Sequence, residues 1–360
     1  DSFKLVELGK FIGGGTPSSS NLSFWTGSIP WISSSDIKED NINNISISRY
    51  ITEDAIEKSA TKYCPAPVIL IVSRVGVGKV ALSHTSLCTS QDFCNIIDIK
   101  CHPVFLSYNL LRTMKRKSRE VQGTSIKGIT SDELQKIRVF IPKNKDEQNK
   151  ISNLLTLLDE RIVTQNKIIE DLKKLKSAIS LNVLHSDTWE QFKIKDIAKI
   201  GRGRVISSIE ISQQKNPTYP VYSSQTSNNG IMGYLDDYMF EGEHISWTTD
   251  GANAGTVFYR NGKFNCTNVC GLLKFRKEFD TYFVSLVLAE ATKKYVSINL
   301  ANPKLMNNTM GNIQIRLPKL EEQKRISIVF RELQKLWTVH NSLLTKYTKQ
   351  KQYLLSQMFI

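Results

Sequence analysis

The sequence predicts an α/β (α+β) fold, with two tandem β-rich α/β domains separated by two long helices that pair as a coiled coil. Three observations carry this prediction: an internal duplication, short β-type runs in both halves, and two long helical stretches with matching apolar spacing. The 360 residues are 40% hydrophobic and 23% charged, as in globular proteins with ample cores. That length exceeds the ~150 residues typical of one domain.

The duplication is visible as short patterns that recur in the same order in both halves. Any one match is weak, but an ordered series indicates a repeated unit. The motif Phe3-Lys4-Leu5, followed by a glycine cluster at 13–15, recurs as Phe192-Lys193-Ile194, followed by Gly201-Arg202-Gly203. The further matching pairs are 29–34 with 219–224, 78–80 with 255–257, 89–91 loosely with 267–269, 137–143 with 313–319, and 147–152 with 322–327.

The β-rich domains are predicted over residues 1–142 and 186–318. Runs such as 68–72 and 257–259 have the β-branched and aromatic composition of strands. Asn229-Gly230 and Asn261-Gly262 are among many turn signals. Each domain is therefore expected to be compact, with a twisted sheet, long loops and short helices.

Long helices are predicted over 143–185 and 319–360, which contain neither Gly nor Pro. Acidic residues occupy the expected first turns, where the helix dipole favours negative charge. About 40 residues of helix would be roughly 60 Å long. Apolar residues recur at three- and four-residue steps, so we expect the helices to pair through Ile151, Leu154, Leu158, Ile168, Leu172, Leu175 and Ile179 with Ile326, Val329, Leu333, Leu336, Leu343, Tyr347 and Leu354.

An alternative interpretation is that each long helix only covers its own globular domain. The shared register of the two stripes, offset by 175 residues, favours the helix pair. Gln165 and His340 fill equivalent polar positions in the stripes. We interpret His340 as a residue that fixes the register of the helices, and not as a metal ligand.

The net charge of +14 points to a polyanion such as nucleic acid. It is spread as +6 over residues 1–185 and +8 over 186–360, which favours one duplex bound twice over a membrane surface. The basic run at 112–119 is either a phosphate contact or a solvated helix face. No stretch has the length of a membrane span or the pattern of a signal peptide. The six cysteines lack zinc-site spacing, so we expect reduced, buried thiols in a cytoplasmic protein.

Catalytic motifs are not recognisable in the sequence. Asn216-Pro217-Thr218-Tyr219 approaches an adenine methyltransferase loop but lacks the second proline, and no cofactor loop accompanies it. The stretch 74–80 does not have the spacing of a nucleotide-binding P-loop. The five histidines show no metalloprotease or triad pattern. We therefore expect no catalytic residues and no metal site in this chain.

Several stretches together resemble the specificity (S) subunit of Type I restriction-modification systems, a bacterial defence. They are Gly14-Gly15-Thr16-Pro17, 29–32, 123–129, the two helices opened by Glu147-Gln148 and Glu322-Gln323, and the second-half stretches 219–234 and 247–255. The resemblance covers essentially the whole chain. It implies that residues 1–142 and 186–318 are target recognition domains, each reading one half of a bipartite DNA sequence.

The resemblance further implies a non-catalytic, prokaryotic cytoplasmic protein whose two long helices pair as an antiparallel coiled coil, set the DNA spacer length and dock two methyltransferase subunits. Its partners would be double-stranded DNA, two methyltransferase (M) subunits and restriction (R) subunits, with no membrane. S-adenosylmethionine would bind the partner methyltransferase subunits, and ATP and Mg would bind the partner restriction subunits. No cofactor is expected in this chain itself.

Polar and basic loop residues are the candidates for DNA contact, because such side chains bind base edges and phosphates. The candidates in the first half are Trp31, Ser33, Ser34, Arg74, Lys79 and Lys127, with Trp31 alternatively a core residue. Those in the second half are Arg202, Arg204, Tyr222, Ser224, Gln225, Thr249, Asp250 and Asn253. A stand-alone DNA enzyme and a coiled-coil adaptor that binds only protein remain the competing hypotheses.

Overall fold

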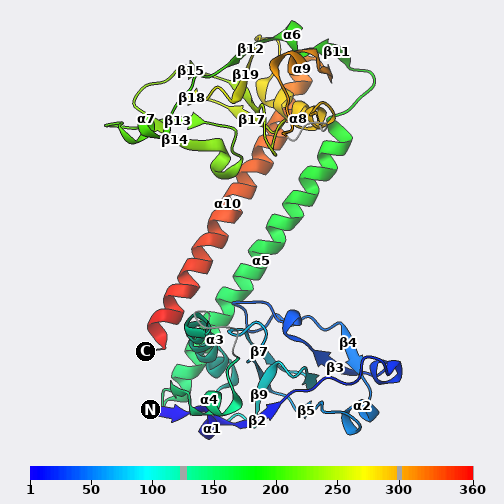
Figure 1. Ribbon diagram of the computed structural model, residues 1–360, viewed down its shortest axis with the longest axis vertical. Helices are drawn as coiled ribbons and strands as arrows, with labels where there is room; N and C mark the ends of the chain where they lie inside the picture. Colours follow the sequence, from blue (N-terminus) through cyan, green and yellow to red (C-terminus); the bar gives the residue numbers. More distant parts are fainter. Residues whose placement is uncertain (122–127, 298–301, 360) are drawn as a thin grey trace. The chain divides into compact units, whose positions relative to one another are not determined.

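A computed structural model describes residues 1–121, 128–297 and 302–359 of the chain. The chain divides into two compact units. Unit 1 comprises residues 1–167 and 340–360, and unit 2 comprises residues 168–339. Each unit therefore contains one β-rich domain and a segment of both long helices (Figure 1).

The domain of unit 1 is built on two four-stranded sheets. One has the order β2 (Lys10–Gly13), β9 (Phe93–Ile97), β6 (Val68–Val72) and β7 (Val80–Ser83). The other has the order β4 (Arg49–Ile51), β3 (Ile29–Ile32), β8 (Leu87–Thr89) and β5 (Tyr63–Cys64). A separate ribbon pairs β1 (Ser2–Lys4) with β10 (Arg138–Phe140). The helical elements are α1 (Leu5–Leu8), η1 (Leu22–Trp25), η2 (Ser34–Asp36), α2 (Glu53–Glu57), α3 (Pro103–Val121) and α4 (Ser131–Lys136).

The domain of unit 2 has the same plan. One sheet has the order β12 (Ala198–Arg202), β19 (Cys270–Phe275), β16 (His244–Thr248) and β17 (Val257–Arg260). The other has the order β14 (Ile231–Leu235), β13 (Tyr219–Tyr222), β18 (Lys263–Cys266) and β15 (Phe240–Glu241). The small ribbon pairs β11 (Glu190–Lys193) with β20 (Gln314–Leu317). The helical elements are α6 (Ile194–Ile197), α7 (Ser208–Ser212), η3 (Ser227–Gly230), α8 (Thr281–Ala291), η4 (Thr292–Lys294) and α9 (Asn307–Asn312).

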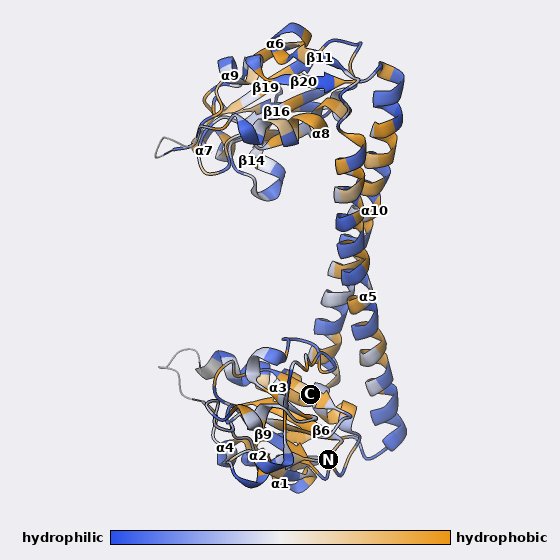
Figure 2. Ribbon diagram, turned by 90° about the vertical axis from the view of Figure 1, so that its right-hand side faces the viewer, coloured by the Kyte–Doolittle hydropathy of each residue, from blue (hydrophilic) through white to orange (hydrophobic). Residues whose placement is uncertain are grey.

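The strand order confirms the predicted duplication. Strands correspond one to one between the domains, and even the parallel strand pair recurs, as β3 with β8 and as β13 with β18. The central strands β6 and β16 are buried along their whole length. Hydrophobic side chains are concentrated in these sheets and in the helices packed on them, α3 and α8 (Figure 2). The two domains are therefore copies of one scaffold.

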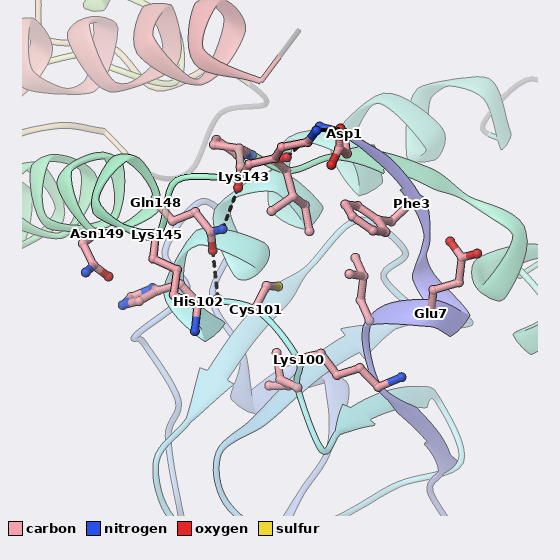
Figure 3. Close-up of a pocket in the computed structure, with 14 residues that line it drawn as sticks. Asp1, Phe3, Glu7, Lys100, Cys101, His102, Lys143, Lys145, Gln148 and Asn149 are labelled. Carbon is pink, nitrogen blue, oxygen red and sulfur yellow. Dashed lines mark hydrogen bonds and ion pairs between the residues drawn. The ribbon is translucent and has the colours of Figure 1, made fainter.

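The long helices are α5 (Lys145–Val183) and α10 (Leu320–Met358), each of 39 residues. The same buried amide fastens the start of each to its domain. In unit 1, Gln148 donates to the Pro142 carbonyl (2.8 Å) and accepts from the backbone of His102 (3.1 Å; Figure 3). In unit 2, Gln323 donates to the Pro318 carbonyl (2.8 Å) and accepts from the backbone of Asp280 (3.0 Å). The glutamine of each Glu-Gln motif thus anchors the start of its long helix to the domain before it.

The helices pack together, as predicted. In unit 1, the imidazole of His340 lies 2.7 Å from the side-chain oxygen of Gln165, so the two predicted polar positions meet. The Arg161 guanidinium lies over the Tyr347 ring at 5.9 Å. In unit 2, Ile179 of α5 packs against the same core as the buried α10 residues.

Burial along the helices differs from the predicted stripe at four positions. Leu154, Leu175, Val329 and Leu336 are 41–48% exposed. Leu155 and Phe330, which directly follow Leu154 and Val329, are fully buried in the domain cores. Near its ends each helix packs on a globular domain as well as on the other helix, and this turns the buried face away from the coiled-coil seam.

A buried ion pair joins the C-terminal part of α10 to the first domain. Lys351 donates to the carboxylate of Asp159, and the two side chains are only 5% and 3% exposed. The Tyr108 hydroxyl of α3 donates to the other carboxylate oxygen (2.8 Å), and Lys351 also donates to the carbonyl of Asp40. Phe359 packs against Phe105 of α3 at 5.1 Å, which adds an apolar contact between the end of the chain and the first domain.

Candidate DNA interface

In each domain three loops lie close together, and each directly follows a strand of one of the two four-stranded sheets. In unit 1 they follow β3, β6 and β8. The Ser73 backbone, just after β6, donates to the Asp92 carbonyl (2.8 Å) and accepts from the Ile129 backbone (2.8 Å). In unit 2, the Thr249 backbone donates to the Val269 carbonyl (3.3 Å) and accepts from the Leu305 backbone (2.8 Å). The same frame is therefore built twice.

A second link joins the loop after β3 to the loop after β6 in unit 1, and the loop after β13 to the last residue of β16 in unit 2. Lys79 donates from its ammonium group to the Ser34 carbonyl (3.1 Å) in unit 1. Thr248 donates from its hydroxyl to the Ser224 carbonyl (3.4 Å) in unit 2. Since Ser34 and Ser224 occupy equivalent positions after β3 and β13, the sequence-predicted loops do come together in each domain.

The first-half candidates occupy different environments within this frame. Arg74 is exposed on the loop after β6, and Lys79 is half-buried. Ser33 is tied into the structure, because its hydroxyl donates to Asp36 (2.8 Å) and accepts from Arg49 (2.5 Å). Trp31 is only 3% exposed and donates to the Gly15 carbonyl (3.0 Å), which makes it a core residue. Lys127 lies outside the described residues.

The second-half arginines are held by neighbouring side chains. Arg202, at the end of β12, donates to the Asn307 side-chain oxygen (2.9 Å). Arg204 forms a bidentate pair with the Glu210 carboxylate, with one hydrogen bond of 2.9 Å. Arg204 is also exposed, so it remains accessible to a phosphate or a base edge.

The remaining second-half candidates lie on the loops after β13 and β16. Gln225 is half-buried and donates to the Ile231 carbonyl (2.5 Å). Thr249 is 1% exposed, and its hydroxyl donates to the Val269 carbonyl (2.9 Å), so it supports the frame. Asn253 is exposed, whereas Asp250, Ser224 and Tyr222 are half-buried.

The two domains differ in charge at one equivalent loop position. Arg74 follows Ser73, and Asp250 follows Thr249, in backbones that make the same hydrogen bonds. A guanidinium donates to the acceptors of a guanine edge, whereas a carboxylate accepts from an exocyclic amino group. The shared frame thus presents opposite hydrogen-bonding chemistry in the two domains.

Two arginines that sequence reasoning missed fix the loops after β3 and β13. Arg49 of β4 bonds Ser33 and Asp36, and Arg260 of β17 is buried beneath the loop of η3. Burial opposes the ionisation of Asp36, but hydrogen bonds from Ser33 and the cation of Arg49 hold its pKa below the usual value. Neither arginine lies in a motif. The exposed side chains Ser227, Asn228 and Asn229 on the second loop were also missed, although the Asn-Gly turn signal marked their position.

Features of other site classes are not found in the described residues. No three His, Cys, Asp or Glu side chains among residues 1–121, 128–297 and 302–359 are grouped to hold a metal ion. All six cysteines are free thiols. Over the same ranges, no helix is long and apolar enough to cross a membrane. A pocket beside Gln148 is lined by Lys100, His102 and other residues around the start of α5, and none of the candidate DNA-contact residues is among them (Figure 3).

Comparison with known proteins connects these loops to one family. The model of the type I restriction modification DNA specificity domain matches residues 1–174 and again residues 186–346. A putative type I specificity subunit N-terminus of Mycoplasma pneumoniae is 46% identical over 140 residues, which are 38% of this chain and 74% of that protein. The MpnII specificity subunit of the same organism is 43% identical over 150 residues, 41% of this chain and 44% of that protein.

The chain spans about half the length of most of the curated relatives that it matches. Among solved structures, the S subunit of a type I restriction-modification system from M. genitalium has a similar fold, with a TM-score of 0.73. The match covers 100% of this chain and 96% of that chain at 18% sequence identity. A structure from a study of complex assembly in the type I system matches with a TM-score of 0.57 at 14% identity.

Proposed function

Because the chain belongs to the family of type I restriction modification DNA specificity proteins, we propose that it reads a bipartite DNA target, with one half-site per domain. The observation that carries this proposal is the loop frame built twice with different side chains. Equivalent backbones in two copies can approach DNA in the same way, while Arg74 and Asp250 would select different bases.

Affinity would come mainly from phosphate contacts, which are independent of sequence. Exposed basic side chains near the loops, such as Arg74 and Arg204, are available for them. In the basic run of α3, Lys115 pairs with Asp40 (2.7 Å), whereas the Arg116 and Arg119 side chains are exposed. Base-edge contacts from the loops would then supply the choice of sequence.

The long helices would set the spacer between the half-sites and dock two methyltransferase subunits. Exposed apolar side chains on both helices support a docking role, since such surface is otherwise costly in water. Leu154 and Val329, at equivalent positions 175 residues apart, are 41% and 47% exposed. Two equal faces would accept two copies of one partner. Those partners would bind S-adenosylmethionine and methylate DNA, restriction subunits would bind ATP and Mg, and this chain would have no catalytic role.

Exchanging residues 1–142 for the corresponding domain of another family member tests independent reading. The complex of the chimaera with the methyltransferase partner should modify a target with one new half-site and one unchanged half-site. Sequencing of methylated positions in genomic DNA would report both half-sites. A change in both half-sites would contradict independent reading.

Lengthening the helices tests their role in setting the spacer. Four residues inserted after Gln165 in α5, and four before His340 in α10, keep the two helices matched. The insertion adds about 6 Å of helix, close to two base pairs of DNA. We expect a longer spacer between unchanged half-sites. An unchanged spacer in a folded variant would refute the role.

A further inference from the structure

The loop that follows β13 rests on a buried arginine. Arg260 is 2% exposed, and no carboxylate is recorded among its partners in the described residues. Its guanidinium lies 3.6 Å from the centre of the Tyr222 ring and 4.4 Å from that of Phe258. Its Nε donates to the Ser246 hydroxyl (2.9 Å). The cation is thus held between two aromatic faces directly below the loop.

Arg260 also fixes the conformation of the loop itself. Three consecutive residues have positive φ, at 48° for Asn228, 53° for Asn229 and 81° for Gly230. Arg260 donates from Nη1 to the Asn229 carbonyl (2.9 Å), at the centre of this run. A methyl group on Gly230 would lie 3.0 Å from Arg260 Nη2, so the loop and the guanidinium are closely fitted. The side chains of Asn228 and Asn229 on this loop are exposed to solvent.

In the first domain, Arg49 has the same role as Arg260 has in the second. The guanidinium of Arg49 lies 4.5 Å from the centre of the Trp31 ring. It donates to the Ser33 hydroxyl (2.5 Å) and to the Asp36 carboxylate (2.6 Å), both in the segment after β3. An arginine stacked on an aromatic residue of the central strand therefore holds the following loop in both domains.

These two arginines are not duplicates of one ancestral position. Arg260 pairs with His244 in the β16–β17 register, and the matching register of β6 and β7 places Ser83 there. Arg49 pairs with Trp31 in the β3–β4 register, and the matching position of β14, opposite Val221, is Gly233. The same loop is fixed from different strands, so each domain has its own arrangement.

From this geometry we infer that Arg49 and Arg260 are positioning residues for base readout, each determining the specificity of one half-site through the loop that it holds. The inference rests on the proposed function. Arg260 acts without touching DNA, because it is buried. A planar guanidinium can stack on an aromatic ring and donate to the loop at once, whereas the compact ammonium of lysine cannot keep both geometries.

The test uses the full chain in complex with its methyltransferase partner. A library of DNA duplexes with two randomised blocks, joined by spacers of varied length, is selected by binding, and the bound fraction is sequenced. The variants are R49K, R49M, R260K and R260M, with thermal unfolding measured in parallel. Y222L, which keeps Arg260 but removes its stacking partner, covers the case in which an Arg260 variant does not fold. Lys58→Met, which removes an exposed paired cation directly after α2, is the control.

We expect R49K and R49M to relax the base preference of the first half-site about 10-fold, near the worth of one base contact, with the second half-site unchanged. R260K, or Y222L in its place, should relax only the second half-site. K58M should leave both half-sites unchanged. Lysine retains the charge, so loss of preference in R49K cannot come from a missing phosphate contact.

The inference is overturned if R49K and R260K, or Y222L, retain the wild-type preferences. It is also overturned if R49M weakens binding equally to all sequences and lowers the salt dependence by about one unit while R49K does not, since that result identifies a phosphate contact. Failure of the proposed function would look different: the wild-type complex itself would then select no bipartite sequence.

Discussion

Replacing Lys351 by Met tests whether the buried ion pair holds α10 to the first domain. Methionine keeps most of the apolar stem but removes the charge that faces Asp159. Both side chains are at most 5% exposed, so the carboxylate would be left buried and uncompensated. Breaking a buried pair on one side costs about 3–5 kcal/mol. For a unit of this size that corresponds to a fall in Tm of about 6–20 °C.

Local hydrogen exchange is the suitable assay, because a chain of two units need not unfold in one step. We expect faster exchange in the last turns of α10 and in α3, which carries Tyr108. Lys349→Met, exposed on the same helix, is the matched control and should change stability by less than about 0.5 kcal/mol. The double variant D159L/K351M should recover most of the loss, since no charge is left unpaired.

The pH dependence of the stability of K351M independently tests whether the Asp159 carboxylate is left buried and charged. Burial raises the pKa of Asp159, although Lys351 and Tyr108 oppose the rise. Without Lys351 the opposing charge is lost, and the pKa should rise further. The penalty in K351M is therefore full at neutral pH and shrinks as pH falls through the folded-state pKa toward about 4, the value in unfolded chains. A cost below about 1 kcal/mol at pH 7, equal to that of K349M, would refute the buried pair.

The other predictions concern the helix starts and the thiols. Gln148→Ala and Gln323→Ala should each lower the free energy of unfolding by about 1–3 kcal/mol, because each leaves a backbone carbonyl and a backbone N–H without a hydrogen-bond partner. The increase in hydrogen exchange should stay within the unit that carries the substitution. Burial raises the pKa of Cys64 to about 11 and that of Cys88 to about 12. Neither thiol should therefore react with iodoacetamide at pH 7.5 until the domain unfolds. Rapid labelling of the native chain would contradict this burial.

Much of the architecture was predictable because it is written in local patterns. The recurrence of short motifs identified two equivalent domains, and the strand order confirms them. Spacing of apolar residues identified α5 and α10, whose observed starts lie within a few residues of the prediction. Gln165 and His340 fill equivalent polar positions in the two stripes, and the structure places their side chains 2.7 Å apart.

The buried side of each helix was less predictable, because it depends on what the helix meets. A heptad pattern assumes one partner along the whole length. Leu155 and Phe330 are instead buried against globular domains, while Leu154 and Val329 face outward. Periodicity cannot distinguish these cases, since three- and four-residue steps suit both kinds of packing.

The sequence indicated which loops carry polar side chains, but their convergence and the roles of the residues within them needed the tertiary structure. The sequence left Trp31 as either a DNA contact or a core residue, and its burial makes it a core residue. Arg49 and Arg260 lie in ordinary strand sequence, and nothing local distinguishes them from surface arginines. Their stacking on Trp31 and Tyr222 exists only after distant strands pair.

The sequence by itself thus determined the duplication, the helices and the loops that carry polar side chains, because repeats, periodicity and turn residues act over a few positions. The tertiary structure alone decided which cations are buried and what they hold. Lys351 meets Asp159 across 192 residues of chain. Such contacts depend on the burial of charge in a packed interior, which no short stretch of sequence encodes.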